Sequence, residues 1–264
     1  MRKYRGEKVG DKVELVKEKV VISGNIVEVY KYEHGYLKGY KLNGAERENK
    51  GRKRGYKSDN YEEHRKQALQ RAKRDLRRII NSNVGAYGEQ FSAKFLTLTF
   101  KDNIQDLKAA NKEFMLFIKR LNYQLFNTKK ANVKYSAVVE FQERGAIHYH
   151  VVIYNIPYVK YDKFVEWWGH GDITINKIDD VDNVGAYVTK YMSKDNADER
   201  LHGEKCYFNS RGLFKPIEET NKKKVEALTD ALPVEKIKFS SCFENEHLGK
   251  INYKQYNLNT YKNK

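Results

Sequence analysis

The chain has 264 residues, and its 51 Lys and Arg residues outnumber 35 Asp and Glu residues, which gives a net charge of +16. No stretch of about 18 apolar residues is present, which excludes a membrane-spanning helix, and nothing near the N-terminus is apolar enough to predict a signal peptide. Two cysteines are too few for a disulfide scaffold or a cysteine-rich zinc module. We therefore expect a reduced, intracellular protein with no membrane partner.

Basic residues concentrate in the N-terminal third of the chain. Residues 1–80 hold 23 basic and 12 acidic side chains, and residues 50–78 alone hold 12 basic and 4 acidic ones. Such a dense basic cluster favours a polyanionic partner. The alternative is a solvated surface or a flexible arm.

The first third of the chain predicts short strands followed by a helix. Residues 9–42 alternate loosely between apolar and polar and are punctuated by glycine, which is typical of short strands. Residues 45–59 are polar and basic and predict a linker. From residue 59 or 60 to residue 80, apolar residues recur at helical spacing, as in Ala72, Leu76 and Ile80. The opposite face of this helix is basic and carries Arg65, Lys66, Arg71, Arg74 and Arg78.

The main domain alternates strands and helices. The patterns predict, in chain order, a strand over 95–100, a helix over 107–125, strands over 134–142 and 147–154, a helix over 161–168, a strand over 172–177 and a helix over 181–194. Residues from 195 on are polar and irregular, apart from a short helix near 222–231. This order predicts an α+β fold, an antiparallel sheet with helices on one face, related to ferredoxin-like folds.

We divide the chain into three parts on this basis. Residues 1–58 form a basic N-terminal segment with short strands and a linker. Residues 59–215 form the main domain together with its leading basic helix, and residues 216–264 form a C-terminal tail.

Two histidines share one face of the strand over 147–154. Successive side chains of a strand alternate between its faces, so His148 and His150 point the same way while Ile147 and Tyr149 point into a core. Two imidazoles side by side on a polar strand face resemble a preformed pair of metal ligands. The pair by itself does not establish a metal site.

The preceding strand adds a carboxylate to the histidine face. Val139 and Phe141 belong to its apolar face, which leaves Glu140 on the other. A three-residue turn would place Glu140 opposite His148 and a five-residue turn opposite His150, so either register brings the carboxylate beside the imidazoles. Two His and one Glu leave coordination positions open for substrate oxygens, as a catalytic ion requires. The alternative is that Glu140 is an ordinary exposed strand residue paired with a histidine.

The helix over 181–194 carries two tyrosines one turn apart. Tyr187 and Tyr191 share a face, and each has a lysine three residues later, Lys190 or Lys194. An ammonium beside a phenol favours the phenolate, which is the nucleophilic form, and a divalent cation would polarise a phosphate for its attack. The alternative is that both tyrosines border the buried face. That face is predicted to comprise Val184, Val188 and Met192.

Three segments, residues 95–100, 144–150 and 187–191, resemble motifs of the HUH endonuclease superfamily in the same order. In that superfamily a histidine–hydrophobic–histidine pair on a strand holds the metal, and a tyrosine on a helix attacks DNA. The similarity covers roughly residues 80–215. It is greatest to rolling-circle replication initiators of bacterial phages and plasmids.

The resemblance implies roles for individual residues. Glu140, His148 and His150 would hold Mg²⁺ or Mn²⁺, although the same ligands would also suit Zn²⁺. Tyr187 would be the first nucleophile and Tyr191 the second, with Lys190 and Lys194 assisting them. The residues that we assign to DNA binding are Arg71, Arg74, Arg78, Thr97, Thr99 and Arg144.

The implied function is initiation of rolling-circle replication in the cytoplasm of a bacterial host cell. Single-stranded DNA of an origin hairpin would be nicked and rejoined through a covalent 5′-phosphotyrosine. The sequence contains no G-x-x-x-x-G-K-[ST] motif, so we expect a separate helicase together with the host polymerase. The alternatives are a relaxase or transposase with the same chemistry and a non-catalytic nucleic-acid binding domain. A small-phosphoester hydrolase is disfavoured by the basic charge.

Overall fold

The computed structural model describes residues 6–8, 13–42, 61–142, 145–176, 178, 181–192 and 205–259. The chain forms two compact units. The terminal unit comprises Met1–Ile22, Ile26–Ala68 and Ile217–Leu258, and the central unit comprises Ser23–Asn25, Leu69–Pro216 and Asn259–Lys264. The linker expected over residues 45–59 lies outside the described residues. No helix in the described part of the chain is long and apolar enough to cross a membrane.

The terminal unit is built on a five-stranded sheet that joins both ends of the chain. Its strands lie in the order β10 (Ile217–Glu219), β2 (Glu14–Ser23), β3 (Ile26–Lys38), β12 (Gly249–Asn257) and β11 (Ile237–Asn245). The short strands β1 (Gly6–Lys8) and β4 (Tyr40–Leu42) pair separately. Helix α5 (Lys222–Asp230) packs Val225 against Val20, Val27 and Val29 of the sheet, and the short 3₁₀ turn η3 (Val234–Lys236) follows it.

The C-terminal segment corrects one expectation from the sequence. Residues 217–258, expected to be irregular apart from one helix, contribute β10, β11 and β12 to this sheet. Strand β12 pairs antiparallel with β3, for example Tyr253 with Tyr30. Many of its side chains are polar, so the local pattern hides a strand whose partner lies more than 200 residues away in the sequence.

The central unit is an antiparallel sheet covered by helices. Its strands lie in the order β8 (Ile173–Asn176), β5 (Lys94–Leu98), β7 (Ile147–Ile153), β6 (Tyr135–Phe141) and β9 (Tyr207–Asn209). The predicted strands and helices of this region are present with shifted ends, and the fold class, α+β with antiparallel sheets, is confirmed.

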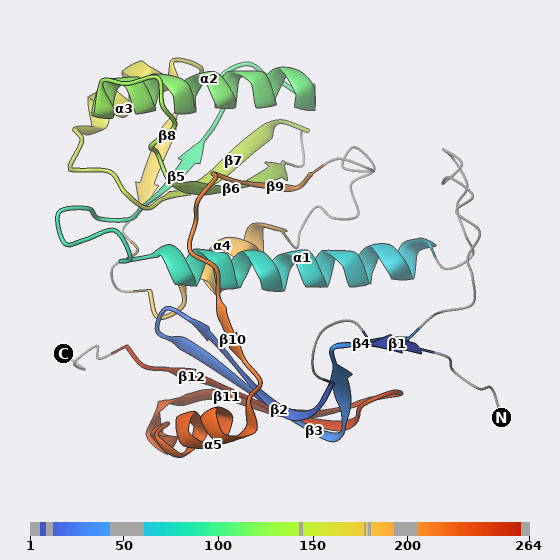
Figure 1. Ribbon diagram of the computed structural model, residues 1–264. Coiled ribbons are helices and arrows are strands. Elements are labelled where there is room, and N and C mark those ends of the chain that lie inside the picture. The colour runs from blue at the N-terminus through green and yellow to red at the C-terminus, as the bar shows by residue number, and fades with distance from the viewer. Residues whose placement is uncertain are drawn as a thin grey trace. The chain divides into compact units, whose positions relative to one another are not determined.

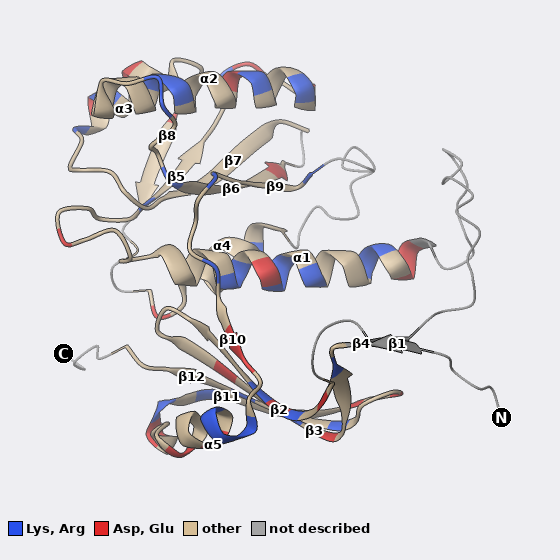
Figure 2. Cartoon of the chain, viewed as in Figure 1, with Lys and Arg blue, Asp and Glu red and all other residues tan. Residues whose placement is uncertain are grey.

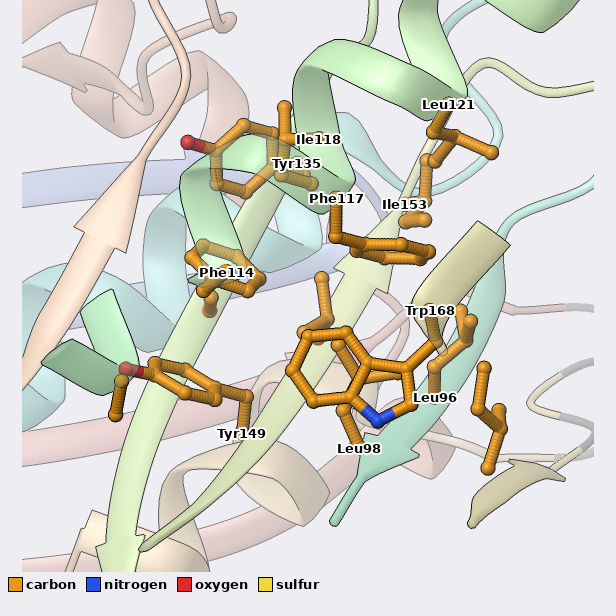
Figure 3. Packing of buried hydrophobic residues seen from close by; sticks show 14 of the residues in the cluster. Leu96, Leu98, Phe114, Phe117, Ile118, Leu121, Tyr135, Tyr149, Ile153 and Trp168 are labelled. Atoms are coloured by element: carbon orange, nitrogen blue, oxygen red, sulfur yellow. The ribbon is translucent and has the colours of Figure 1, made fainter. Parts of the chain in front are cut away.

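One face of the central sheet is covered by α2 (Leu107–Phe126) and α3 (Tyr161–Trp168) (Figures 1 and 3). Helix α2 begins where the Asp106 side chain accepts a hydrogen bond from the amide of Lys108, 2.8 Å away. The core on this face is aromatic: Phe114 stacks on Tyr149, with ring centroids 4.6 Å apart, and Trp168 lies 5.0 Å from Phe100. We call this face the aromatic face.

The other face is covered by α1 (Tyr61–Asn83) and α4 (Val184–Thr189), the latter continued by the 3₁₀ turn η1 (Lys190–Met192) (Figure 1). Leu76 and Ile80 of α1 are fully buried here against sheet residues that include Val138 and Val152. The expectation that the helices cover only one face is therefore corrected. Strand β7 is buried along its whole length on both sides, which requires covering elements on both.

Candidate active site

The candidate metal ligands lie on the face of the central sheet that α1 and α4 cover. Strands β6 and β7 pair in the register that sets Glu140 opposite His148 and Val138 opposite His150. This is one of the two registers expected from the sequence, the one with the shorter turn. Because the helices cover this face, both histidines are buried, His148 at 8% exposure and His150 at 3%.

His150 is held at both ring nitrogens. Its Nε2 atom lies 2.5 Å from Oε2 of Glu140, and its Nδ1 atom lies 3.1 Å from Oγ1 of Thr97 on the neighbouring strand β5. Thr97 is directly opposite His150 in the register of β5 and β7. In metal-binding histidines, a hydrogen bond at one imidazole nitrogen usually orients the ring so that the other nitrogen faces the metal.

The donor set fits a divalent cation chemically. A carboxylate oxygen and imidazole nitrogens are ligands for Mn²⁺ and Zn²⁺, while Mg²⁺ favours the carboxylate and water. His148 lies on the same side of β7 as His150 and opposite Glu140 in the sheet. Among the described residues, however, no group of three or more His, Cys, Asp or Glu side chains is arranged to hold a metal ion.

The two tyrosines of the α4–η1 segment face these strands. The Tyr191 ring stacks on the His150 ring, with centroids 3.7 Å apart and planes inclined by 16°. Tyr187 meets Phe95 of β5 edge to face at 5.4 Å, and its ring lies 6.2 Å from that of Tyr191. The expected buried stripe of this helix, with Val188 at its centre, packs against the same face.

Charged groups of both signs lie near the two tyrosines. The Nζ atom of Lys190 lies 3.9 Å from the centroid of the Tyr187 ring and 5.1 Å from that of Tyr191. Burial, followed by its hydrogen bond with Tyr187 and the negative charges that Tyr187 and Glu140 can carry, raises the pKa of Tyr191 to about 12. Tyr191 is therefore a neutral phenol at neutral pH in this arrangement, and added positive charge would favour its phenolate.

Helix α4 is attached directly to α1. Its cap residue, Asn183, accepts a hydrogen bond from the amide of Ala186 (2.9 Å). The Asn81 side chain of α1 donates to Asn183 (2.9 Å) and accepts from the amide of Gly185 (2.8 Å). A Cβ atom at position 185 would lie only 2.2 Å from the carbonyl oxygen of Arg77, so the contact requires glycine.

Sequence reasoning missed Asn81 and the orienting role of Thr97. The Asn183 cap could have been found, because asparagine at this position before a helix is a start signal. Asn81 could not, because its partners lie 102 and 104 residues away.

The residues predicted to bind DNA divide into several groups. Arg71 and Arg74 are exposed on α1, whereas Arg78 is buried at 9% exposure, which corrects its expected place on the exposed basic face. The Thr99 hydroxyl group is bonded to the backbone of Asp172 at 3.0 and 3.1 Å. Arg144 and the catalytic candidate Lys194 lie outside the described residues.

The central unit is an antiparallel α+β sheet with the histidine pair on a central strand and the tyrosines on a covering helix, which is consistent with an HUH-like fold. Residues 93–196 match the replication-associated protein ORF2 family, which comprises rolling-circle replication initiators. The match confirms the resemblance to Rep-type initiators predicted from the sequence and implies that DNA is a partner. No curated protein matches the chain, and no solved structure does.

Proposed function

We propose that the protein initiates rolling-circle replication by nicking and rejoining single-stranded origin DNA through a covalent 5′-phosphotyrosine. The observation that carries this proposal is the stacking of Tyr191 on His150, 3.7 Å between ring centroids, with the Glu140 carboxylate 2.5 Å from the same imidazole. Tyr191, a candidate nucleophile, and Glu140, a candidate metal ligand, thus both contact His150, a second candidate metal ligand. The match of residues 93–196 to a replication-initiator family supports the same role.

The ligands proposed for the metal are Glu140, His148 and His150, and the ion is Mg²⁺ or Mn²⁺. When bound, the ion would polarise the scissile phosphate and neutralise charge in the transition state. Thr97 would position His150 through its Nδ1 atom. Burial of both histidines excludes much of the bulk water, which strengthens electrostatic interactions at the site.

The chain's own nucleophile is a tyrosine. The phenolic oxygen forms a bond to phosphorus while the bond from phosphorus to the 3′ oxygen breaks. The phenol proton passes to water, and the departing 3′ oxygen gains a proton to become a free hydroxyl group. Rejoining is the reverse reaction, in which a 3′ hydroxyl group attacks the phosphotyrosine and releases the phenol.

We assign the first cleavage to Tyr187 and the second to Tyr191. Tyr187 is the nearer of the two to the Lys190 ammonium, which lies 3.9 Å from the centroid of its ring and can offset negative charge at the reacting phosphate. Tyr191 stacks on His150 and has the raised pKa. With two nucleophiles, one subunit could cleave the regenerated origin while still attached to the first 5′ end. Lys194 would assist Tyr191, a separate helicase would unwind the duplex, and the host polymerase would extend the 3′ end.

The test uses a pool of single-stranded oligonucleotides with a randomised centre, incubated with the full chain and Mn²⁺. We expect adducts that survive SDS, carry one enriched sequence and map to phosphotyrosine at residue 187. Tyr187→Phe should remove the first adduct, Tyr191→Phe should leave it intact but block the second transfer, and Tyr158→Phe, an exposed position, should change neither.

Two outcomes would contradict the proposal. Absence of any SDS-stable adduct would favour a non-catalytic binding domain. Normal adduct formation by Tyr187→Phe together with none by Tyr191→Phe would reverse the proposed order of the two tyrosines.

A further inference from the structure

A basic cleft lies beside the tyrosine helix in the central unit. It encloses about 410 Å³ between α1 and α4. Arg71, Lys73, Arg74 and Arg77 of α1 line one side, and Ala186 and Thr189 of α4 line the other. Figure 2 shows the Lys and Arg residues along α1.

The cleft carries a strong positive charge. Four of its lining residues are cationic, and none is acidic. The neighbouring Asp75 pairs with Arg74 at 3.4 Å, but both side chains are about half exposed, so a phosphate can displace this ion pair at little cost. Four cations at one cleft focus the field on an anion that carries several charges.

One side of the cleft belongs to the helix that carries the nucleophile candidate Tyr187. Ala186 lines the cleft, and the next residue in the same helix is Tyr187. The bonds from Asn81 to Asn183 and Gly185 attach that helix to α1, which carries the cationic side of the cleft. An anion bound in the cleft would therefore contact the same helix that carries Tyr187, and that helix is bonded to α1.

The chemistry of the lining indicates which part of a nucleic acid is bound. None of the lining residues is aromatic, so the cleft has no surface on which a base could stack. Arginine and lysine side chains recognise phosphates, and contacts to phosphates position a strand without reading its sequence.

We infer that the α1–α4 cleft binds backbone phosphates of the single DNA strand adjacent to the nick, and so sets which phosphate reaches the tyrosines. This rests on the proposed nicking function. The sequence predicted that DNA binds the exposed basic face of this helix, whereas the inferred site is the cleft between α1 and α4. The site includes Lys73 and Arg77 and excludes Arg78, which is buried and does not line the cleft.

The first test measures binding without cleavage. In a Tyr187→Phe, Tyr191→Phe background, the triple variant Arg71→Gln, Lys73→Gln, Arg74→Gln is titrated against a fluorescent 15-nucleotide oligo(dT) at several salt concentrations. Each phosphate contact on a single strand contributes about 0.7 to the salt slope, so we expect the slope to fall by about two units and the affinity at about 0.1 M salt to fall about 100-fold. Glutamine preserves helix propensity, and unchanged circular dichroism checks the fold.

The matched control removes the same charge elsewhere. Lys108→Gln, Lys112→Gln and Lys119→Gln alter exposed positions of α2, on the aromatic face of the sheet. We expect a loss of affinity below about threefold. An equal loss in both triple variants, or an unchanged salt slope in the cleft variant, would overturn the inference. If the cleft triple variant unfolds, the single variants Arg71→Gln and Arg74→Gln, both at exposed positions, replace it.

The second test separates this inference from the proposed nicking. A single methylphosphonate is placed at each position in turn along the oligonucleotide that is nicked. Binding of each oligonucleotide is then compared between the protein with an unaltered cleft and the triple variant. Neutralising one phosphate near the nick should weaken binding to the intact protein and leave binding to the variant unchanged. Identical binding profiles for the two proteins would overturn the inference about the cleft and would leave the proposed nicking function unaffected. If the wild-type chain forms no adduct, the proposed function fails, and the oligo(dT) slopes still decide whether the cleft binds DNA.

Discussion

Tyr149 and His150 are neighbours on β7 and face opposite sides of the central sheet, where each stacks on an aromatic ring from a covering helix. Tyr149 stacks on Phe114 with centroids 4.6 Å apart, and His150 stacks on Tyr191 at 3.7 Å. The surroundings differ. Tyr149 is fully buried, and its hydroxyl group donates to Asn111 at 2.6 Å. On the other face, Tyr191 is only partly buried and the imidazole contacts a carboxylate.

The difference shows how one strand serves two purposes. On the aromatic face, burial raises the pKa of Tyr149, which keeps the phenol protonated and inert. On the opposite face, Val138 and Val152 belong to an apolar cluster, and the polar side chains of Glu140, His148 and His150 lie on the same side of the sheet. The aromatic face holds apolar packing and no candidate ligand, so we expect changes there to act on stability, whereas changes to the polar group on the opposite face should act mainly on activity.

The largest expected effect is the loss of nicking in His148→Ala. A bound divalent ion contributes several kcal/mol to the transition state, and about 1.4 kcal/mol corresponds to tenfold, so the rate should fall about 1,000-fold or more. Chelation of the wild-type protein should have the same effect. Binding to single-stranded DNA should persist, because phosphate contacts supply most of the affinity. Full nicking in His148→Ala or in excess chelator would contradict the metal assignment.

Next in size is the effect of Trp168→Ala on stability. Trp168 is fully buried on the aromatic face, contacts Phe117 at 5.5 Å between centroids, and donates from Nε1 to the carbonyl oxygen of Thr99 at 2.7 Å. Removing a buried tryptophan ring should lower the free energy of unfolding by about 3–5 kcal/mol. Urea unfolding measures this. A loss below about 1 kcal/mol would show that the aromatic face is not the main core.

A smaller effect is expected at the contact between α1 and α4. Gly185→Ala would bring a Cβ atom to 2.2 Å from the carbonyl oxygen of Arg77, which forces the helices apart. Overpacking of this kind costs about 1–3 kcal/mol. The displaced helix also carries the tyrosines, so adduct formation should fall by more than the fraction of unfolded protein explains. Unchanged stability and unchanged adduct formation would show that the helix contact is not rigid.

The smallest expected effect is that of Thr97→Val. The change keeps the side-chain volume and removes the hydrogen bond to Nδ1 of His150. Loss of a partner that orients a ligand typically weakens metal affinity or activity by about 10-fold to 100-fold, and we expect the lower end here because Glu140 still holds the ring. Mn²⁺ affinity by calorimetry is the measurement. Thr99→Val, which alters a hydroxyl bonded to the Asp172 backbone, is the matched control and should leave Mn²⁺ affinity unchanged.

Several features of the site were accessible from local patterns. Alternation along the strand places His148 and His150 on one side, and the apolar residues of the facing strand leave Glu140 on that side. Helical spacing identified the buried stripe that orients Tyr187 and Tyr191, since Val184, Val188 and Met192 are all buried. These inferences hold because side-chain direction depends on local backbone geometry.

The features that local patterns did not supply depend on partners distant in sequence. Periodicity shows which residues of α1 face the sheet, but it does not show that Arg78 is also covered. The polar segments β11 and β12 are strands because β11 pairs with β12 and β12 pairs with β3. Val138 and Val152 are apolar residues on the same face as the histidines, which indicates that helices cover this face as well. Alternation along the strands did not predict this second covered face.

By itself the sequence determined the class of fold, the histidine pair with its carboxylate, the tyrosine helix and the basic first helix, because each depends on the periodicity of one element. Only the tertiary structure decided that helices cover both faces of the sheet, that Tyr191 stacks on His150, and that α1 and α4 enclose a basic cleft. These arrangements result from the packing of elements about 100 residues apart, as the bonds between Asn81 and the start of α4 illustrate. No local pattern encodes the distance between such elements, because that distance is set by how whole surfaces fit together.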